Sequence, residues 1–196
     1  MRAGPRAKIY LSIDLDYFDN RCSEDPASAM LAFMERVHRE VPLEVPVRVV
    51  RDHHWLLSSF RDLRFGRLIN FDFHSDLTDE GVHNPLTGED LNCGTWVNFV
   101  PGQQHKQYVW SPPAKWCTTS YPTCLCNGKR HNPFWNHLYH GWRQVGYRVY
   151  GLDDVDLKRV IGIGISRSPT WTSKWVQIMW KRHQRRLFRG RPRRRR

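Results

Sequence analysis

Residues 70–77, with the sequence NFDFHSDL, combine an apolar, strand-like segment with three groups that can do chemistry. In an extended strand every second side chain points to the same face, so Asp72, His74 and Asp76 would lie together. Two carboxylates and an imidazole without partners in a protein core would cost on the order of several kcal/mol. A bound cation is the simplest partner, and the segment therefore predicts part of a metal site.

The elements around this segment indicate how further ligands could reach it. Apolar and β-branched runs predict three strands, at residues 8–13, 47–50 and 67–73. Between them we expect a helix beginning at Asp25-Pro26 and a short helix over residues 54–63. This alternation predicts an α/β fold, a parallel sheet flanked by helices with right-handed crossovers. The carboxyl ends of the three strands then meet at one edge of the sheet, where such folds bind their ligands.

Polar side chains follow all three predicted strands. The first is followed by Asp14, Asp16 and Asp19, the second by Asp52, His53 and His54, and the third by the trio described above. A mixed Asp/His set without thiolates suits Mn²⁺, Fe²⁺ or Zn²⁺ better than Ca²⁺. Six ligands are more than one tetrahedral zinc ion can bind, but they suit a pair of octahedral ions that share carboxylates. We therefore predict a two-metal site, which is typical of enzymes that hydrolyse otherwise inert bonds.

These motifs resemble those of the arginase (ureohydrolase) superfamily. SIDLDYFDN is similar to its Ser-x-Asp-x-Asp-x-x-Asp-Pro signature, with Asn20 in place of the proline, and DFHSD is similar to its Asp-x-His-x-Asp motif. The DHH segment resembles the family's Asp-His. The Asp-x-Asp motif comes late in arginases but leads here, so the resemblance implies an arginase-like fold with circularly permuted motif order in a shorter chain.

A small, divergent branch is the better match, because it shares the NCGTWVNF stretch. These are peptide arginases, which convert arginine side chains of ribosomally made precursor peptides to ornithine. The resemblance is specific over about seventy N-terminal residues and looser to the GIGISRSPTWT loop. It implies a hydrolase whose partner is an arginine-containing precursor peptide and whose products are an ornithine side chain and urea. Separately, an N-terminus without the apolar run of a signal peptide and an odd number of cysteines lead us to expect a cytoplasmic protein.

The resemblance also implies two Mn²⁺ ions per chain and assigns their ligands. Asp14 and Asp72 would bridge the ions, His53 and Asp76 would complete one site, and His74 and Asp16 the other. His54 remains an alternative to His53, because the ligand could be either of the two adjacent histidines of the DHH segment. Asp19 would orient the turn at the strand end from outside the ligand set.

Substrate binding and proton transfer require further groups. A guanidinium stays protonated near neutral pH, so acceptors must hold it, and a histidine must protonate the leaving amine. The candidates are Glu80, Glu89 and Asp90 for the guanidinium, Asn92 and Trp96 for other substrate contacts, and His83 or His54 for the acid. For Glu80, His83, Glu89 and Asp90, taken one at a time, an ordinary solvent-exposed loop residue is the favoured interpretation.

Three rival enzymes and one non-enzymatic interpretation remain open. DHH phosphoesterases also use two metals and an Asp-His-His motif, although the glycine-rich substrate motif of that family is not found here. The segment IYLSIDLDYF resembles the first motif of haloacid-dehalogenase-like phosphatases, but Tyr17 stands where Thr or Val is expected. A small-molecule ureohydrolase would use the same metal ligands. A non-enzymatic alternative is a binding module with a structural metal site.

The charge of the chain is concentrated near its C-terminus. The formal net charge is +12, and ten of the 31 Lys and Arg residues lie at 181–196, where no acidic residue occurs. We expect a single arginase-like α/β domain over residues 1–180 and a disordered Arg-rich tail over 181–196. The tail could attract an acidic partner or RNA. No apolar run is long enough to span a membrane.

The rest of the chain gives weaker signals. We expect short strands at 96–100 and 107–110, a helix at 135–143, a buried strand at 160–166 and a helix at 173–184. The cluster Cys117, Cys124, Cys126 and His131 matches no common zinc spacing, so unligated cysteines are the favoured interpretation.

Overall fold

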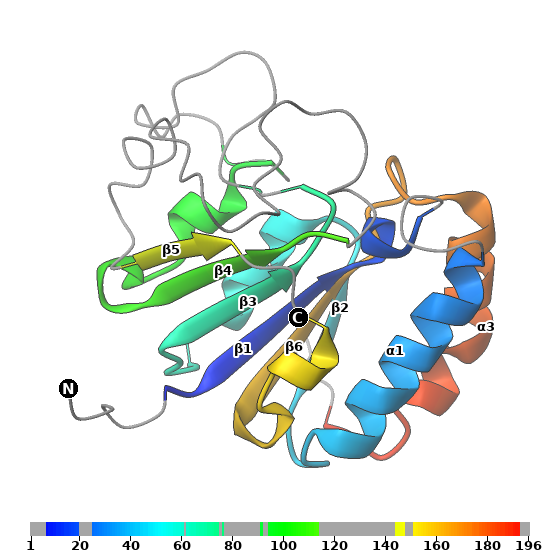
Figure 1. The fold of residues 1–196 in the computed structure, drawn as a ribbon, viewed down its shortest axis with the longest axis horizontal. Coiled ribbons are helices and arrows are strands. Elements are labelled where there is room, and N and C mark those ends of the chain that lie inside the picture. The colour runs from blue at the N-terminus through cyan, green and yellow to red at the C-terminus, as the bar shows by residue number, and fades with distance from the viewer. Residues whose placement is uncertain are drawn as a thin grey trace.

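The computed structural model is shown in Figure 1. It describes residues 7–19, 25–60, 62–74, 76, 91, 94–113, 144–147 and 151–192. The core of the molecule is a parallel six-stranded sheet in the order β2-β6-β1-β3-β4-β5. Its strands are β1 (Ile9–Asp14), β2 (Val47–Val50), β3 (Arg67–Phe71), β4 (Gln107–Ser111), β5 (Gln144–Tyr147) and β6 (Val160–Ser166). The predicted α/β class with a parallel sheet is confirmed, whereas an arginase-like fold and a permutation stay predictions.

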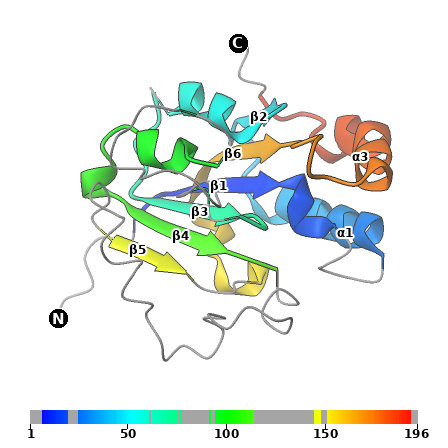
Figure 2. The same cartoon turned by 90° about the horizontal axis from the view of Figure 1, so that it is seen from above.

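Two long helices pack together on one face of the sheet, α1 (Pro26–Glu40) and α3 (Lys174–Leu187), as Figure 2 shows. Both begin as the sequence predicts. The Asp25 carboxylate accepts the Ser28 amide at 3.2 Å ahead of Pro26, and the Ser173 hydroxyl accepts the Val176 amide at 3.4 Å. These caps satisfy amide groups that have no partner within the helix.

Short 3-10 helices connect the strands. They are η1 (Leu15–Phe18), η2 (His53–Ser59), η4 (Trp96–Phe99), η5 (Gln103–His105), η8 (Leu152–Asp154) and η9 (Leu157–Arg159). The short helix predicted over 54–63 corresponds to η2, which is tighter and ends earlier. The strand predicted at 96–100 is wrong, because this segment forms η4. The helix predicted at 135–143 lies outside the described residues, as do the three cysteines and the histidine of the suggested zinc cluster.

The sheet divides the core into two apolar clusters. Alternate residues of β1 point to opposite faces, so Ile9, Leu11 and Ile13 pack with α1 and α3. Tyr10 points the other way and packs with Phe60 and other residues of the η2 and η4 region. All six residues of β1 are buried, which places this strand at the centre of the molecule.

The predicted boundary between domain and tail at residue 181 is not where the folded part ends. Helix α3 continues to Leu187, and Leu187 and Phe188 are buried in the same cluster as the centre of the sheet. The Arg191 side chain is also buried. Its guanidinium donates to the carbonyl oxygens of His38, Val41 and Pro42 at 2.7, 2.8 and 2.6 Å.

These carbonyls lie at the C-terminus of α1, where helix carbonyls lack partners and a cation is favourable. The residues from 181 to 192 therefore belong to the fold, and residues 193–196 lie outside the described part. No helix among the described residues is both long enough and apolar enough to cross a membrane.

Candidate metal centre

The sheet order brings the carboxyl ends of β1 and β3 together. β2 and β6 lie on one side of β1, and β3 lies on the other. The connections that leave β1 and β2 therefore lead to opposite sides of β1, and the order of the strands reverses at this point. Ile13 pairs with Phe71 in the register of these strands. Asp14, the last residue of β1, therefore lies beside Asp72, the first residue after β3. Open α/β sheets bind ligands at such a reversal.

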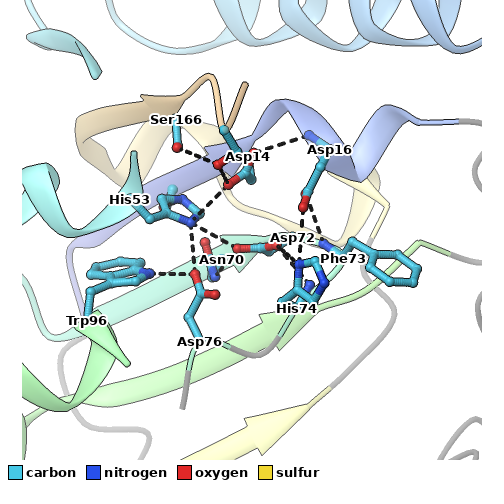
Figure 3. A network of polar contacts seen from close by, with 12 residues as sticks. Asp14, Asp16, His53, Asn70, Asp72, Phe73, His74, Asp76, Trp96 and Ser166 are labelled. Atoms are coloured by element: carbon cyan, nitrogen blue, oxygen red, sulfur yellow. Dashed lines mark hydrogen bonds and ion pairs between the residues drawn. The ribbon is translucent and has the colours of Figure 1, made fainter. Parts of the chain in front are cut away.

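His53 enters this edge from η2 and meets three carboxylates. Its Nδ1 atom lies 3.2 Å from Oδ2 of Asp14, 3.0 Å from Oδ2 of Asp72 and 2.8 Å from Oδ2 of Asp76 (Figure 3). All four side chains are buried. The ligand atoms of Asp14, His53 and Asp72 lie within 4.8 Å of one another, close enough to share one ion.

A second group lies next to the first. The Nδ1 atom of His74 lies 3.1 Å from Oδ2 of Asp16 and 3.9 Å from Oδ1 of Asp72. Asp16, Asp72 and His74 again offer ligand atoms within 4.8 Å of one another. Asp72 is thus common to both groups. Asp14 belongs to the first group among the described residues, and its role as a bridge stays a prediction.

Each buried ligand has hydrogen-bond partners that set its orientation. The hydroxyl of Ser12 lies 3.0 Å from Nε2 of His53, on the opposite side of the ring from the carboxylates. Asn70 donates from Nδ2 to Oδ2 of Asp72 at 3.1 Å, and Trp96 donates from Nε1 to Oδ2 of Asp76 at 2.5 Å. Such outer contacts fix the tautomer and direction of metal ligands.

Backbone amides stabilise the same carboxylates. The amide of Asp16 donates to Oδ1 of Asp14 at 3.1 Å, and the amide of His74 donates to Oδ1 of Asp72 at 2.8 Å. The Ser168 hydroxyl, on the loop after β6, donates to Oδ2 of Asp14. Asp76 and Ser168 have positive φ angles of 53° and 37°, a conformation that is uncommon outside glycine. Strained backbone of this kind concentrates at functional sites.

The electrostatics of the cluster favour a cation. Burial raises the pKa of Asp14 and of Asp72, and the neighbouring carboxylates raise both further. Burial, followed by repulsion from Asp72, raises the pKa of Asp16 to about 6. Burial lowers the pKa of His74, but the Asp16 and Asp72 carboxylates outweigh it and raise the value to about 9. These shifts show that the crowded anions require positive charge, which protons or metal ions can supply.

The residues present fit a metal centre. The donor set is four carboxylates and two imidazoles, without a thiolate, and suits Mn²⁺, Fe²⁺ or Zn²⁺. With neutral imidazoles, the four negative charges would balance two divalent cations. The structure therefore contains buried Asp and His groups that could hold metal ions. The identity and the number of such ions stay predictions.

The structure brings together all six residues that we predicted as metal ligands. It also distinguishes the two histidines of the DHH segment: His53 points into the cluster, whereas His54 packs against Trp55 with ring centroids 5.2 Å apart and belongs to neither group. Trp96 is fully buried and supports Asp76 from behind. The other candidates, Glu80, His83, Glu89, Asp90 and Asn92, lie outside the described residues.

Sequence reasoning missed the supporting residues Ser12, Asn70 and Ser168. The first two sit on the strands two positions before Asp14 and Asp72, on the same strand face, and this spacing could have identified them. No sequence signal links Ser168 to Asp14, because the contact depends on which strand lies beside β1.

Comparison with family models, with curated proteins and with solved structures found no match.

Proposed function

We propose that this protein is a dinuclear metal hydrolase that cleaves the guanidinium group of arginine side chains in a peptide, leaving ornithine and releasing urea. The observation that carries the proposal is the position of Asp72, which is common to two adjacent groups of buried carboxylate and imidazole ligands. A shared carboxylate is what a pair of neighbouring ions requires. The resemblance of the ligand motifs to those of arginases supports the choice of the guanidinium as the bond attacked.

The residues of the cluster would hold and orient such ions. Ser12 lies beside Nε2 of His53, and this contact leaves Nδ1 directed toward Asp14 and Asp72. Asn70 holds Asp72 in place by donating to Oδ2. Two Mn²⁺ ions bound here would supply Lewis acidity and an activated water for hydrolysis. Burial of the ligands other than His74 limits their contact with bulk water and strengthens the charge interactions among them.

The guanidinium itself would be held by acceptors, because it keeps its proton near neutral pH. Glu80, Glu89 and Asp90 stay the candidates for this contact, and His83 or His54 for protonation of the leaving amine. A peptide substrate is favoured over free arginine by the resemblance to peptide arginases. The RNA or acidic partner suggested by the basic C-terminal residues stays a separate prediction.

The experiment is urea release from Mn²⁺-loaded protein given free arginine or an arginine-containing peptide, with the peptide mass measured afterwards. We expect urea from the peptide and loss of one CH₂N₂ unit per modified arginine. Asp72→Asn should abolish both signals. Asp52→Asn is the matched control, because Asp52 lies at the same edge of the sheet, before η2, but in neither ligand group.

The outcomes separate the rival functions. Urea from free arginine as readily as from the peptide would indicate a small-molecule ureohydrolase. Metal binding without urea from either substrate would reject the proposal. The next substrate would then be a phosphodiester, because DHH phosphoesterases and other two-metal enzymes use similar donor sets.

A further inference from the structure

The metal centre is open to solvent at His74. The His74 side chain is 29% exposed, whereas the side chains of the other five predicted ligands are at most 5% exposed. A substrate that approaches through the described part of the molecule therefore meets His74 before it meets any other ligand. Residues beside His74 are in a position to select what enters.

Trp171 lies at this opening. Its ring contacts the ring of His74, with centroids 5.5 Å apart and an angle of 63° between the planes. Yet 58% of Trp171 remains exposed. Trp55 and Trp175 are exposed to a similar degree, at 58% and 55%, but among these exposed tryptophans of the described residues Trp171 is the one whose ring contacts a member of the two ligand groups. The uncovered part of its indole is therefore available to a substrate at this opening.

The loop that carries Trp171 is held rigidly against the metal centre. The Ser168 hydroxyl donates to Asp14, and the amide of Trp171 donates to the Ser168 carbonyl at 2.9 Å. On the other side of the loop, Gln177 of α3 donates from Nε2 to the Pro169 carbonyl at 3.1 Å. These contacts hold the backbone that carries Trp171, and the ring contact with His74 orients the indole toward the opening. Such prior placement lowers the entropy cost of binding.

We infer that Trp171 is a substrate-positioning residue whose indole, beside His74, packs against a planar cationic side chain of the substrate. The inference rests on the function proposed above and names the group that recognises the guanidinium from outside the ligand set. A guanidinium is flat, always charged and weakly hydrated, and it stacks readily on aromatic faces. Tryptophan offers the most favourable face for such a cation–π contact. A neutral group of the same shape would gain the packing but not the charge interaction.

The test compares binding and hydrolysis in four Mn²⁺-loaded proteins: the wild type, Trp171→Ala, Trp171→Phe and Trp175→Ala. Trp175 is the matched control, since it lies four residues further on and is exposed to a similar degree, at 55%. The ligands are an arginine-containing peptide and the same peptide with neutral citrulline in place of arginine. Calorimetry gives Kd for each peptide, metal analysis gives the Mn²⁺ content, and urea release gives KM and kcat.

We expect Trp171→Ala to weaken binding of the arginine peptide by about 3- to 30-fold, the usual range of a cation–π contact. Its KM should rise by a similar factor, while kcat and Mn²⁺ content stay close to those of the wild type. Trp171→Phe should recover most of the affinity, and Trp175→Ala should bind like the wild type. The citrulline peptide should bind weakly to every protein and distinguish the variants little.

Three results would overturn the inference: equal affinity of the wild type and Trp171→Ala for the arginine peptide, no preference of the wild type for arginine over citrulline, or loss of Mn²⁺ from Trp171→Ala in proportion to its loss of binding. The last result would mean that Trp171 acts on His74 rather than on the substrate. Failure of the proposed hydrolysis is a separate outcome. In that case the wild type would release no urea, while it would still bind the arginine peptide more tightly than Trp171→Ala does.

Discussion

The Nδ1 atom of His53 and the Oδ2 atom of Asp76 lie 2.8 Å apart, although Asp76 has a left-handed backbone that non-glycine residues rarely adopt. The same Asp76 oxygen accepts the indole N–H of Trp96. One oxygen thus faces a predicted metal ligand and a buried tryptophan. The contacts with these two partners favour a backbone conformation that would otherwise be unfavourable.

Replacement of Trp96 by Phe should weaken metal binding. The substitution keeps an aromatic ring in the core but removes the donor to Asp76, and loss of such outer contacts typically costs about 10- to 100-fold in metal affinity. Mn²⁺ titration of the metal-free variant measures the effect. Trp180→Phe is the control, because Trp180 is equally buried while its Nε1 has no hydrogen-bond partner in the described part of the chain. Equal Mn²⁺ affinity of the two variants would contradict the role of Trp96.

Replacement of Asp72 by Asn should lower the number of bound ions. Asp72 is the ligand common to both groups, so its loss weakens two sites at once. We expect at most one Mn²⁺ per chain instead of two, and at least about a 100-fold loss of urea release. Metal analysis after gel filtration measures the first and a urea assay the second. A variant that still retains two ions would show that Asp72 does not bridge them.

The metal-free protein should become less stable as the pH rises from 6.5 to about 9. The pKa of His74 is raised from its ordinary value of 6.5 to about 9, so the folded state binds this proton more tightly than the unfolded state. The resulting stability is fully present below pH 6.5 and is lost as the pH approaches 9. The pKa of Asp16, raised from 3.8 to about 6, acts with the same sign in the range below.

Thermal unfolding in the presence of a chelator measures this pH dependence. The Tm should fall across pH 6.5–9, and His74→Gln should flatten the slope. Mn²⁺-loaded protein should behave in the opposite way, because protons and metal ions compete for the same atoms. A metal-free Tm that rises with pH over this range would contradict the electrostatic description of the cluster.

Replacement of Arg191 by Ala should destabilise the fold. The buried guanidinium donates to three carbonyls at the end of α1, and hydrogen bonds from charged groups are worth more than neutral ones. We expect a loss of about 2–4 kcal/mol in the free energy of unfolding, measured by denaturant titration. A small effect of Arg191→Ala would mean that water replaces the guanidinium at these carbonyls.

The candidate ligands were predictable from the sequence for a simple geometric reason. Three strands of a parallel sheet end at one edge, and an apolar run in the sequence indicates each of them. Asp14 is the last residue of its strand, and His53 and Asp72 come shortly after theirs. His74 and Asp76 reach the cluster as the segment NFDFHSDL predicts, but strand alternation is not the reason, because β3 ends at Phe71 rather than at residue 73 and Asp76 has a left-handed backbone. The prediction from the strand ends requires no knowledge of how the rest of the sheet is assembled.

The errors have equally specific causes. The apolar run at residues 96–100 predicts a strand, but a short run of this kind does not distinguish a strand from one turn of helix. In η4 the buried Trp96 and Val97 are adjacent rather than alternate. The Arg-rich composition after residue 181 favours a disordered tail, although α3 continues to Leu187. Leu187 follows Trp180 at helical spacing with Phe188 beside it, but the surrounding arginines resemble a solvated tail. Arg191 could not be placed, because only the packed position of α1 creates its acceptors.

The position of β6 in the sheet has a consequence for how the chain is made. β6 begins at Val160, yet it is the strand that joins β1 to β2, which ends at Val50. A ribosome releases the ends of β1, β2 and β3 long before it releases β6 and Ser168. While the chain is being synthesised from its N-terminus, β1 and β2 therefore lack their common neighbour, and the carboxylate of Asp14 lacks its serine partner. All six candidate ligands lie within residues 14–76, so a chain that stopped before residue 160 would contain every one of them and still lack the sheet neighbour and the serine contact that complete their arrangement.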